Sequence, residues 1–337
     1  MLALETQHSL EHLHNRLRRD IQHFTVMDEF SGAELRFPLE KQGLAVDIEQ
    51  KQPWQQVIPF LADGRSHTDD FLAQPPDTLR MDWVYGFNGH AGKHHVHYSN
   101  MGEVLYPAAS FVIVFNIGDT SQKYYAGHID IVTCLKLRRF DSGDTVVASG
   151  ELGMRPAIHV WSPKSMETLS VLRGFHRNGI IQLDFSPNGE QLVSLGMDPY
   201  HSVAIYDWAS QQRVFSARSS CSPCNDIRYL TEHSIACCAD RQVVFWQKSE
   251  MYPVWKRTRG LFPRDQPQEV FAIAAIDNYV VTGGAAGYIQ IWEGRNCVRS
   301  IKGHAGLVTV LYVFNSVNGP VLFSGCTAGK IQTWNQK

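Results

Sequence analysis

The segment VVTGGAAGYIQIWE, residues 280–293, joins two short β-type runs through a glycine-rich turn and ends on an apolar strand that carries a tryptophan. Four other segments have the same kind of ending: AIHVWS (157–162), VAIYDW (203–208), VVFWQ (243–247) and IQTWN (331–335). The aromatic residues of the five endings are spaced by 45, 40, 46 and 42 residues: Trp161, Tyr206, Trp246, Trp292 and Trp334. The chain therefore contains an internal repeat with a period in the forties.

Each ending follows two further strand-like runs, such as IVTCLKL (131–137) and VVASGEL (146–152) in one unit. Several short β runs in each unit of this length indicate the blade of a β-propeller. Gly-His pairs at 127–128 and 303–304 lie 176 residues apart, which is four periods of 44. We therefore predict an all-β propeller of six or seven blades, with a first blade within residues 79–128 and the others within 129–337.

The repeats resemble the WD-repeat family, in which a Gly-His histidine, a mid-strand Ser or Thr, a turn Asp and a strand-ending Trp form a hydrogen-bonded network inside one blade. The resemblance places His128, Ser149 and Trp161 in one such network and His304, Ser324 and Trp334 in another. The turn Asp is absent from both, while Asp198 and Asp240 occupy that position in other units. The strand-ending tryptophans Trp246 and Trp292 complete the set of expected structural residues.

The segment WVYG (83–86) with Gly89, followed by an apolar strand pair that ends in YYAGH (124–128), resembles the hydrophobic motif of the echinoderm microtubule-associated protein family. In that family the motif precedes WD repeats and packs into the propeller core. The resemblance covers roughly residues 79–337. It implies that Trp83, Tyr85, Gly86 and Gly89 are structural residues, with the two aromatic side chains in the core.

A cluster of four histidines follows this motif: His90, His94, His95 and His97. In a strand, His95 and His97 share a face about 6.6 Å apart and have the residue type that binds zinc. The resembled family offers no precedent for a metal there, so we interpret the histidines as polar residues of the propeller rim. Cys221 and Cys224 with Cys237 and Cys238 also imitate zinc spacing, but adjacent strand residues point to opposite faces. We expect reduced, buried thiols and no metal or cofactor.

The first 78 residues differ in composition from the rest, with 7 Lys/Arg against 13 Asp/Glu, while residues 79–337 have 24 against 20. Apolar residues at helical spacing predict an amphipathic helix within residues 1–26: Leu10, Leu13, Leu17, Ile21 and Phe24. Residues 27–78 contain five prolines among acidic residues and are expected to form an irregular leader. We also consider residues 33–37 or 79–85 as the source of an outer strand for the last blade, since the chain ends on the third strand of that unit.

Composition excludes several classes of function. The longest apolar run, residues 105–117, is interrupted and shorter than the roughly 20 residues that cross a membrane. The N-terminus lacks the apolar stretch of a signal peptide, so we expect the cytoplasm. No long basic run supports nucleic-acid binding. No nucleophile motif, phosphate loop or carboxylate pair has its required context, so we do not expect an enzyme.

The resemblance implies a non-catalytic scaffold of the cytoskeleton that binds tubulin or microtubules, with an axonemal partner, a cilium or a spindle among the settings it allows. Family members often carry a longer coiled coil and a basic region before the propeller, which this sequence does not have in its acidic leader. The alternative is a general WD-repeat adaptor of a complex without microtubules. The sequence decides neither the binding face nor the oligomeric state.

Overall fold

The computed structural model describes residues 23–27, 34–38, 81–87, 95–219, 223–249, 251, 254–263, 268–316 and 319–335. The chain divides into two units, residues 1–80 and residues 81–337. In the first unit, β1 (His23–Met27) pairs in antiparallel fashion with β2 (Glu34–Pro38). The helix expected within residues 1–26 lies mainly outside the described residues, and its last positions belong to strand β1.

The second unit consists of six antiparallel sheets, each a simple meander of consecutive strands. Blade 1 is β3 (His97–Tyr98), β4 (Glu103–Ala108), β5 (Phe111–Asn116) and β6 (Ser121–Tyr125). Blade 2 is β7 (Val132–Arg139), β8 (Thr145–Glu151), β9 (Ile158–Trp161) and β10 (Thr168–Leu172). Blade 3 is β11 (Ile180–Phe185), β12 (Gln191–Gly196), β13 (Ser202–Asp207) and β14 (Gln212–Arg218).

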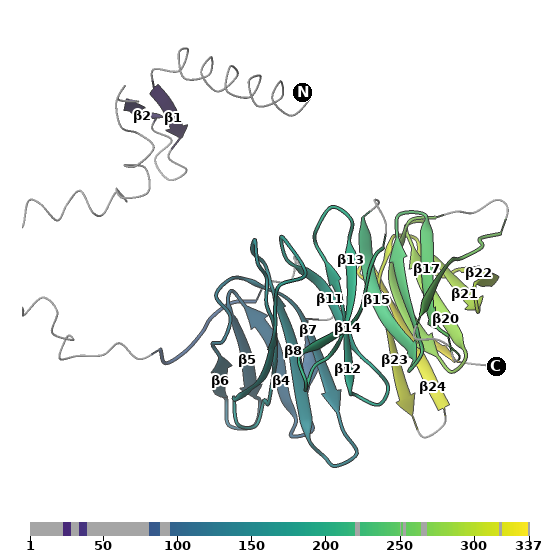
Figure 1. The fold of residues 1–337 in the computed structure, drawn as a ribbon, viewed down its shortest axis with the longest axis horizontal. Helices are drawn as coiled ribbons and strands as arrows, with labels where there is room; N and C mark the ends of the chain where they lie inside the picture. The colour runs from purple at the N-terminus through teal and green to yellow at the C-terminus, as the bar shows by residue number, and fades with distance from the viewer. Residues whose placement is uncertain are drawn as a thin grey trace, which may run out of the picture. The chain divides into compact units, whose positions relative to one another are not determined.

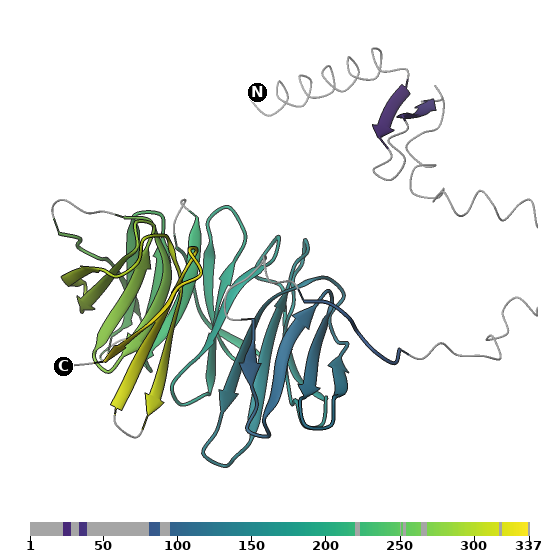
Figure 2. The ribbon, with the colours of Figure 1, turned by 180° about the vertical axis from the view of Figure 1, so that it is seen from behind.

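Blade 4 is β15 (Cys224–Thr231), β16 (Ser234–Ala239), β17 (Gln242–Lys248) and β18 (Trp255–Arg259). Blade 5 is β19 (Val270–Ile276), β20 (Tyr279–Gly284), β21 (Tyr288–Glu293) and β22 (Asn296–Lys302). Blade 6 has three strands, β23 (Val308–Ser316), β24 (Gly319–Cys326) and β25 (Ile331–Asn335). Figures 1 and 2 show the sheets following one another in chain order. The prediction of an all-β propeller is confirmed, with six blades.

The core lies between consecutive sheets. One apolar cluster joins Cys134 and Ile158 of blade 2 to Leu183 and Leu192 of blade 3. Middle strands are therefore buried on both faces, as in β13, whereas β14 at the edge of the same sheet alternates between half-buried and exposed residues. Burial on both faces explains why the middle strands are continuous apolar runs and not alternating patterns.

A register shift recurs at the start of the first strand in each of blades 2 to 6. The bulged residue often reaches the next blade, since Thr133 Oγ1 donates to the carbonyl of Ile180 over 2.5 Å and Asn225 Nδ2 donates to the carbonyl of Val270 over 2.8 Å. A bulge twists its strand and redirects a side chain. In this protein the repeated bulge helps to connect each sheet to its neighbour.

Neither segment considered as the source of an outer strand has that role among the described residues. Residues 34–38 pair with β1, and residues 81–87 form no strand. Blade 6 thus has β25 at its edge and keeps Trp334 only half-buried. The described residues contain no helix that could cross a membrane.

Candidate functional site

The first structural network that the sequence indicated lies in blade 2. His128 Nε2 is 2.6 Å from Ser149 Oγ, and Trp161 Nε1 donates to the same oxygen over 3.0 Å. All three side chains are buried, and the ring of Tyr125 stacks on Trp161 at 4.4 Å. The network therefore links the loop before β7 to β8 and β9.

Glu151 is a member of this network that the sequence analysis missed. Its Oε2 is 3.0 Å from His128 Nδ1, and its two oxygens accept the backbone N–H groups of Ile129 and Ala157. Burial opposes ionisation of Glu151, but the hydrogen bonds outweigh it and lower the carboxyl pKa to about 2. A carboxylate only accepts, so His128 donates from Nδ1 and, when neutral, accepts from Ser149 at Nε2. An acidic residue two positions after the serine was the available signal.

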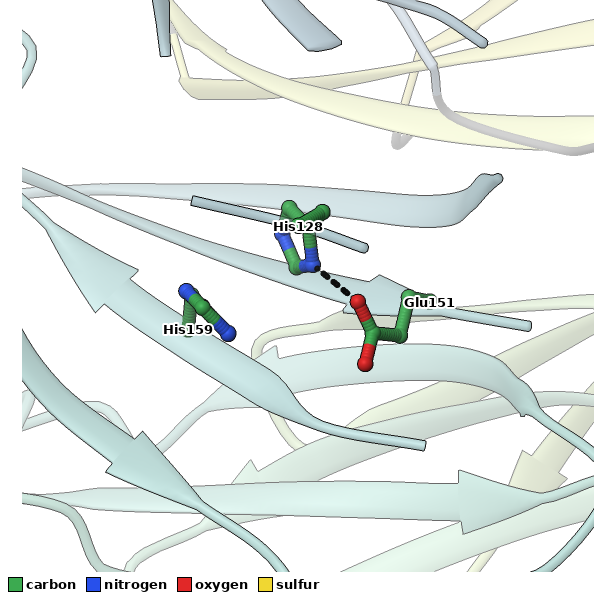
Figure 3. A group of neighbouring side chains, drawn as sticks. All are labelled: His128, Glu151 and His159. Carbon is green, nitrogen blue, oxygen red and sulfur yellow. Dashed lines mark hydrogen bonds and ion pairs between the residues drawn. The ribbon is translucent and has the colours of Figure 1, made fainter. Parts of the chain in front are cut away.

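His128, Glu151 and His159 form the one group of three ligand-type side chains found in the described part of the chain, with their ligand atoms within 4.8 Å of one another (Figure 3). Two histidines and a glutamate are donors that zinc accepts. Both nitrogens of His128 and both oxygens of Glu151 already take part in hydrogen bonds, and His159 Nδ1 is 2.8 Å from the hydroxyl of Tyr125. Burial, aided by the charge of His128, lowers the pKa of His159 to about 4. The arrangement acts as a hydrogen-bond network and keeps His159 neutral at physiological pH.

Blades 3 and 6 contain related networks. His176 lies 2.6 Å from Ser194 Oγ and 2.9 Å from Ser202 Oγ, and Ser202 donates to Asp198. Asp198, in the turn between β12 and β13, thus belongs to the network of blade 3. In blade 6, His304 Nε2 is 2.7 Å from Ser324 Oγ, which also accepts from Trp334 Nε1, while His304 Nδ1 is buried without a partner: no acidic residue fills the place that Glu151 has in blade 2.

Blades 4 and 5 differ at the residue that meets the tryptophan. Trp292 Nε1 donates to Thr282 Oγ1 over 2.9 Å, but Trp246 Nε1 is buried without a partner. The strand register explains the difference. Cys237 pairs with Val244 just as Thr282 pairs with Gln290, so a cysteine occupies the position of the hydroxyl. Trp246 therefore contributes packing alone, with its side chain 1% exposed.

The expectation that Trp83 and Tyr85 lie in the core is wrong. Their side chains are 37% and 87% exposed, and Trp83 packs edge-on against Phe115 of β5. The segment is attached to blade 1 by the N–H of Val84, which donates to Gln122, so it lies along one side of the sheet. Gly86 has a φ of 104°, which other residues rarely adopt, whereas Gly89 lies outside the described residues.

Two of the four clustered histidines are described. His95 Nε2 lies 2.7 Å from the carbonyl of Thr133, and His97 Nε2 lies 3.1 Å from the carbonyl of Leu135. Both contacts join β3 or its approach to β7, so these histidines link blade 1 to blade 2. His90 and His94 fall outside the described residues, as does Cys221, and the six described cysteines form no disulfide.

A chain of buried and half-buried charges crosses the first strands of blades 2, 3 and 4. Lys136 Nζ is 2.7 Å from Asp184, and Arg228 lies 3.7 Å from Asp184 and 3.5 Å from Asp226. Burial lowers the pKa of Lys136 against the attraction of Asp184. Asp184 therefore contacts a cation on each side, Lys136 of blade 2 and Arg228 of blade 4. Because each acid also accepts a backbone N–H from a neighbouring blade, the chain holds the blades in register.

Six consecutive meanders, with complete His–Ser–Trp networks in blades 2 and 6 and partial ones in blades 3 and 5, define the WD type of β-propeller. The family model for the first β-propeller of echinoderm microtubule-associated protein matches residues 121–337, and the HELP motif model matches residues 74–113. The chain belongs to the echinoderm microtubule-associated protein family, which confirms the resemblance seen in the sequence.

Similar proteins include echinoderm microtubule-associated protein-like 4 of Mus musculus, 27% identical over 83% of this chain and 31% of that protein. The 77 kDa echinoderm microtubule-associated protein of Strongylocentrotus purpuratus is 27% identical over 77% of this chain and 39% of its own length. The chain thus spans about a third of the length of these relatives. Solved structures with the same fold include the β-propeller domain of Myceliophteria thermophila Cps50 (Swd1), with a TM-score of 0.51 at 21% identity over 60% of this chain and 65% of that chain.

Proposed function

We propose that the protein is a non-catalytic scaffold of the microtubule cytoskeleton in the cytoplasm, and that its propeller surface binds tubulin or microtubules. The observation that carries the proposal is the match of the first-propeller family model across residues 121–337. Fold alone does not determine function, so the proposal depends on this family membership and on the names of the relatives, which are microtubule-associated proteins.

The chemistry of the buried side chains supports a binding role. Three side chains that would be candidates for catalysis in blades 2 and 3, His128, Glu151 and His176, are buried and engaged in hydrogen bonds within their blades. Groups that are fixed and shielded in this way stabilise sheets and cannot reach a substrate. Surface loops of the propeller remain as the contact elements.

Co-sedimentation of the purified chain with polymerised tubulin tests the proposal. We expect the protein in the microtubule pellet at low salt and less of it at high salt, because exposed charges are screened. Pull-downs with soluble tubulin separate binding to the lattice from binding to the free subunit. Absence of tubulin in both assays would overturn the proposal and favour the adaptor of a complex without microtubules.

A further inference from the structure

A pocket of about 600 Å³ lies at one edge of blade 3. It is formed by the loop before β11, the turn between β12 and β13, and the end of β14. Ligand pockets typically enclose about 300 to 1,000 Å³. The side chains that matter for its chemistry are two arginines, two aromatic residues, a proline and an acid: Arg177, Arg218, Phe175, Tyr200, Pro199 and Asp198.

Two arginines of this region, Arg213 and Arg218, are positioned by aromatic rings. The guanidinium carbon of Arg218 lies 4.3 Å from the ring centre of Tyr200, and that of Arg213, beside the pocket, lies 4.5 Å from the ring centre of Phe175. Stacking on a ring orients the flat guanidinium group and leaves its N–H donors at the edge free to bind a carboxylate. Of the two arginines that line the pocket, Arg218 therefore presents donors that are already ordered.

The charge of the pocket is positive at its mouth. Arg177, Arg213 and Arg218 are exposed, and within the described residues none of them forms an ion pair. The carboxylate of Asp198 is buried, where it accepts hydrogen bonds from Ser202 and the N–H of Tyr200. Burial opposes its ionisation, but these bonds keep its pKa below the usual value. An anion entering the pocket thus meets two guanidinium groups, those of Arg177 and Arg218, and one acid that is already engaged.

The backbone around the pocket is held in conformations that non-glycine residues seldom adopt. Asn178 has a φ of 67° and His201 a φ of 42°, one in each of two loops at the pocket. His201 Nδ1 is also buried without a partner. Asn and His adopt this conformation more readily than most non-glycine residues, and it fixes the shape of the two loops.

We propose that this pocket binds an acidic peptide segment of a partner protein. Two carboxylates of the peptide contact Arg177 and Arg218, and an apolar side chain between them lies against Phe175 and Pro199. Charge-assisted, bidentate bonds between arginine and carboxylate are the strong contacts in this arrangement. The inference goes beyond the proposed function, because it names the chemistry of the bound segment whichever protein carries it.

Fluorescence anisotropy with a synthetic peptide tests the inference. The probe is a fluorescein-labelled peptide with glutamates on both sides of one leucine, and the control peptide has glutamine at each glutamate. We expect the acidic probe alone to bind, and more weakly at about 300 mM than at about 50 mM salt. The double variant Arg177→Gln with Arg218→Gln should lower the affinity at least about tenfold.

A matched control variant is available in blade 5. Lys302 of β22 pairs with Tyr288, the first residue of β21, just as Arg218 of β14 pairs with Ser202, the first residue of β13. Lys302→Gln therefore removes a positive charge from the equivalent place and should leave peptide binding unchanged. The double variant removes the stacking of Arg218 on Tyr200 and could therefore melt at a lower temperature than wild type. In that case peptide binding is compared between wild type and the single variant Arg177→Gln, which leaves this stacking in place.

Several results would overturn the inference: no binding of the acidic probe, equal binding of the glutamine peptide, or full affinity in the arginine variants. Co-sedimentation of the same proteins keeps this outcome separate from the proposed function. If wild type pellets with microtubules but does not bind the acidic probe, the peptide-binding proposal for the pocket is refuted and the proposed function is not. Wild type that binds the probe but does not pellet supports the pocket and refutes the microtubule proposal.

Discussion

Blades 5 and 6 are built from similar sequences but differ in how deeply their residues are buried. The third strand of blade 5 has Trp292 at 0% exposure, and β22 lies beside it. The third strand of blade 6 is the edge of its sheet, and its first residue, Ile331, is 77% exposed. In the first strand of the same blade, Tyr312 is 57% exposed. The comparison shows that the burial of a blade's residues depends on the neighbouring blade and on a fourth strand as much as on the residue types of its first three strands.

The largest expected effect comes from the tryptophans of these two blades. Trp292→Ala should lower the free energy of unfolding by about 3 to 5 kcal/mol, because it removes a fully buried aromatic side chain. Trp334→Ala should cost clearly less, because Trp334 is only half-buried. Chemical denaturation of both variants measures the difference. Equal losses would show that blade 6 is as well packed as blade 5.

The second effect concerns the hydroxyl at the centre of the network in blade 2. Ser149→Ala leaves the buried donor of Trp161 and one nitrogen of His128 without a partner, which should cost about 1 to 3 kcal/mol. Ser149→Thr, which keeps a hydroxyl as Thr282 does in blade 5, is the control and should cost less. A loss in the Thr variant as large as in the Ala variant would mean that space, and not the hydrogen bond, decides stability at this position.

The third effect is a dependence on pH that distinguishes blade 2 from blade 6. The pKa of His159 is about 4 in the folded protein against an ordinary value of 6.5. Between these values the unfolded chain binds a proton that the folded chain does not, so stability falls as the pH drops from 6.5 towards 4, by at most about 1.4 kcal/mol per pH unit.

The variant His159→Gln tests this dependence, because Gln332 occupies the corresponding position in blade 6: it pairs with Ser324 as His159 pairs with Ser149. The loss of stability between pH 7 and pH 5 should be smaller in the variant than in wild type. An unchanged pH profile, measured by denaturation at each pH, would contradict the assignment to His159.

The smallest effect is expected at the surface of blade 1. Tyr85 is 87% exposed, so Tyr85→Ala should change the free energy of unfolding by no more than about 0.5 kcal/mol. Leu105→Ala, in a fully buried position of β4 in the same blade, is the matched control and should cost about 2 to 5 kcal/mol. A large loss at Tyr85 would indicate that another part of the chain covers it.

The period of the aromatic residues was enough to predict the propeller, because the first three strands of blades 2 to 5 are largely buried and apolar. The fourth strands, such as β14 and β22, were not identified, since they are half-exposed and polar and their sequences resemble loops. His128 and Ser149 could be paired from the motif. The acidic residue two positions after the serine was visible in the sequence, but its role was not, because that role depends on a loop that places Ile129 and Ala157 beside Glu151.

The exposure of the WVYG segment also could not be predicted from the sequence. Its apolar composition is that of a core strand, and its exposure depends on which parts of the chain lie beside it in the fold. The pocket at blade 3 could not be predicted either, because it too depends on which segments the fold brings together. Its two arginines, Arg177 and Arg218, come from segments about 40 residues apart, and they meet because the loop before β11 and the end of β14 both lie at the turn between β12 and β13.

The difference between blade 5, which has four strands, and blade 6, which has three among the described residues, is tested most directly by amide hydrogen exchange of the full chain, measured for each strand. The account predicts slow exchange in β21, which is paired on both sides, and fast exchange at alternate amides of β25, which are open at the edge of blade 6. Equally slow exchange in β21 and β25 would contradict the account, since it would require another strand on the edge of blade 6.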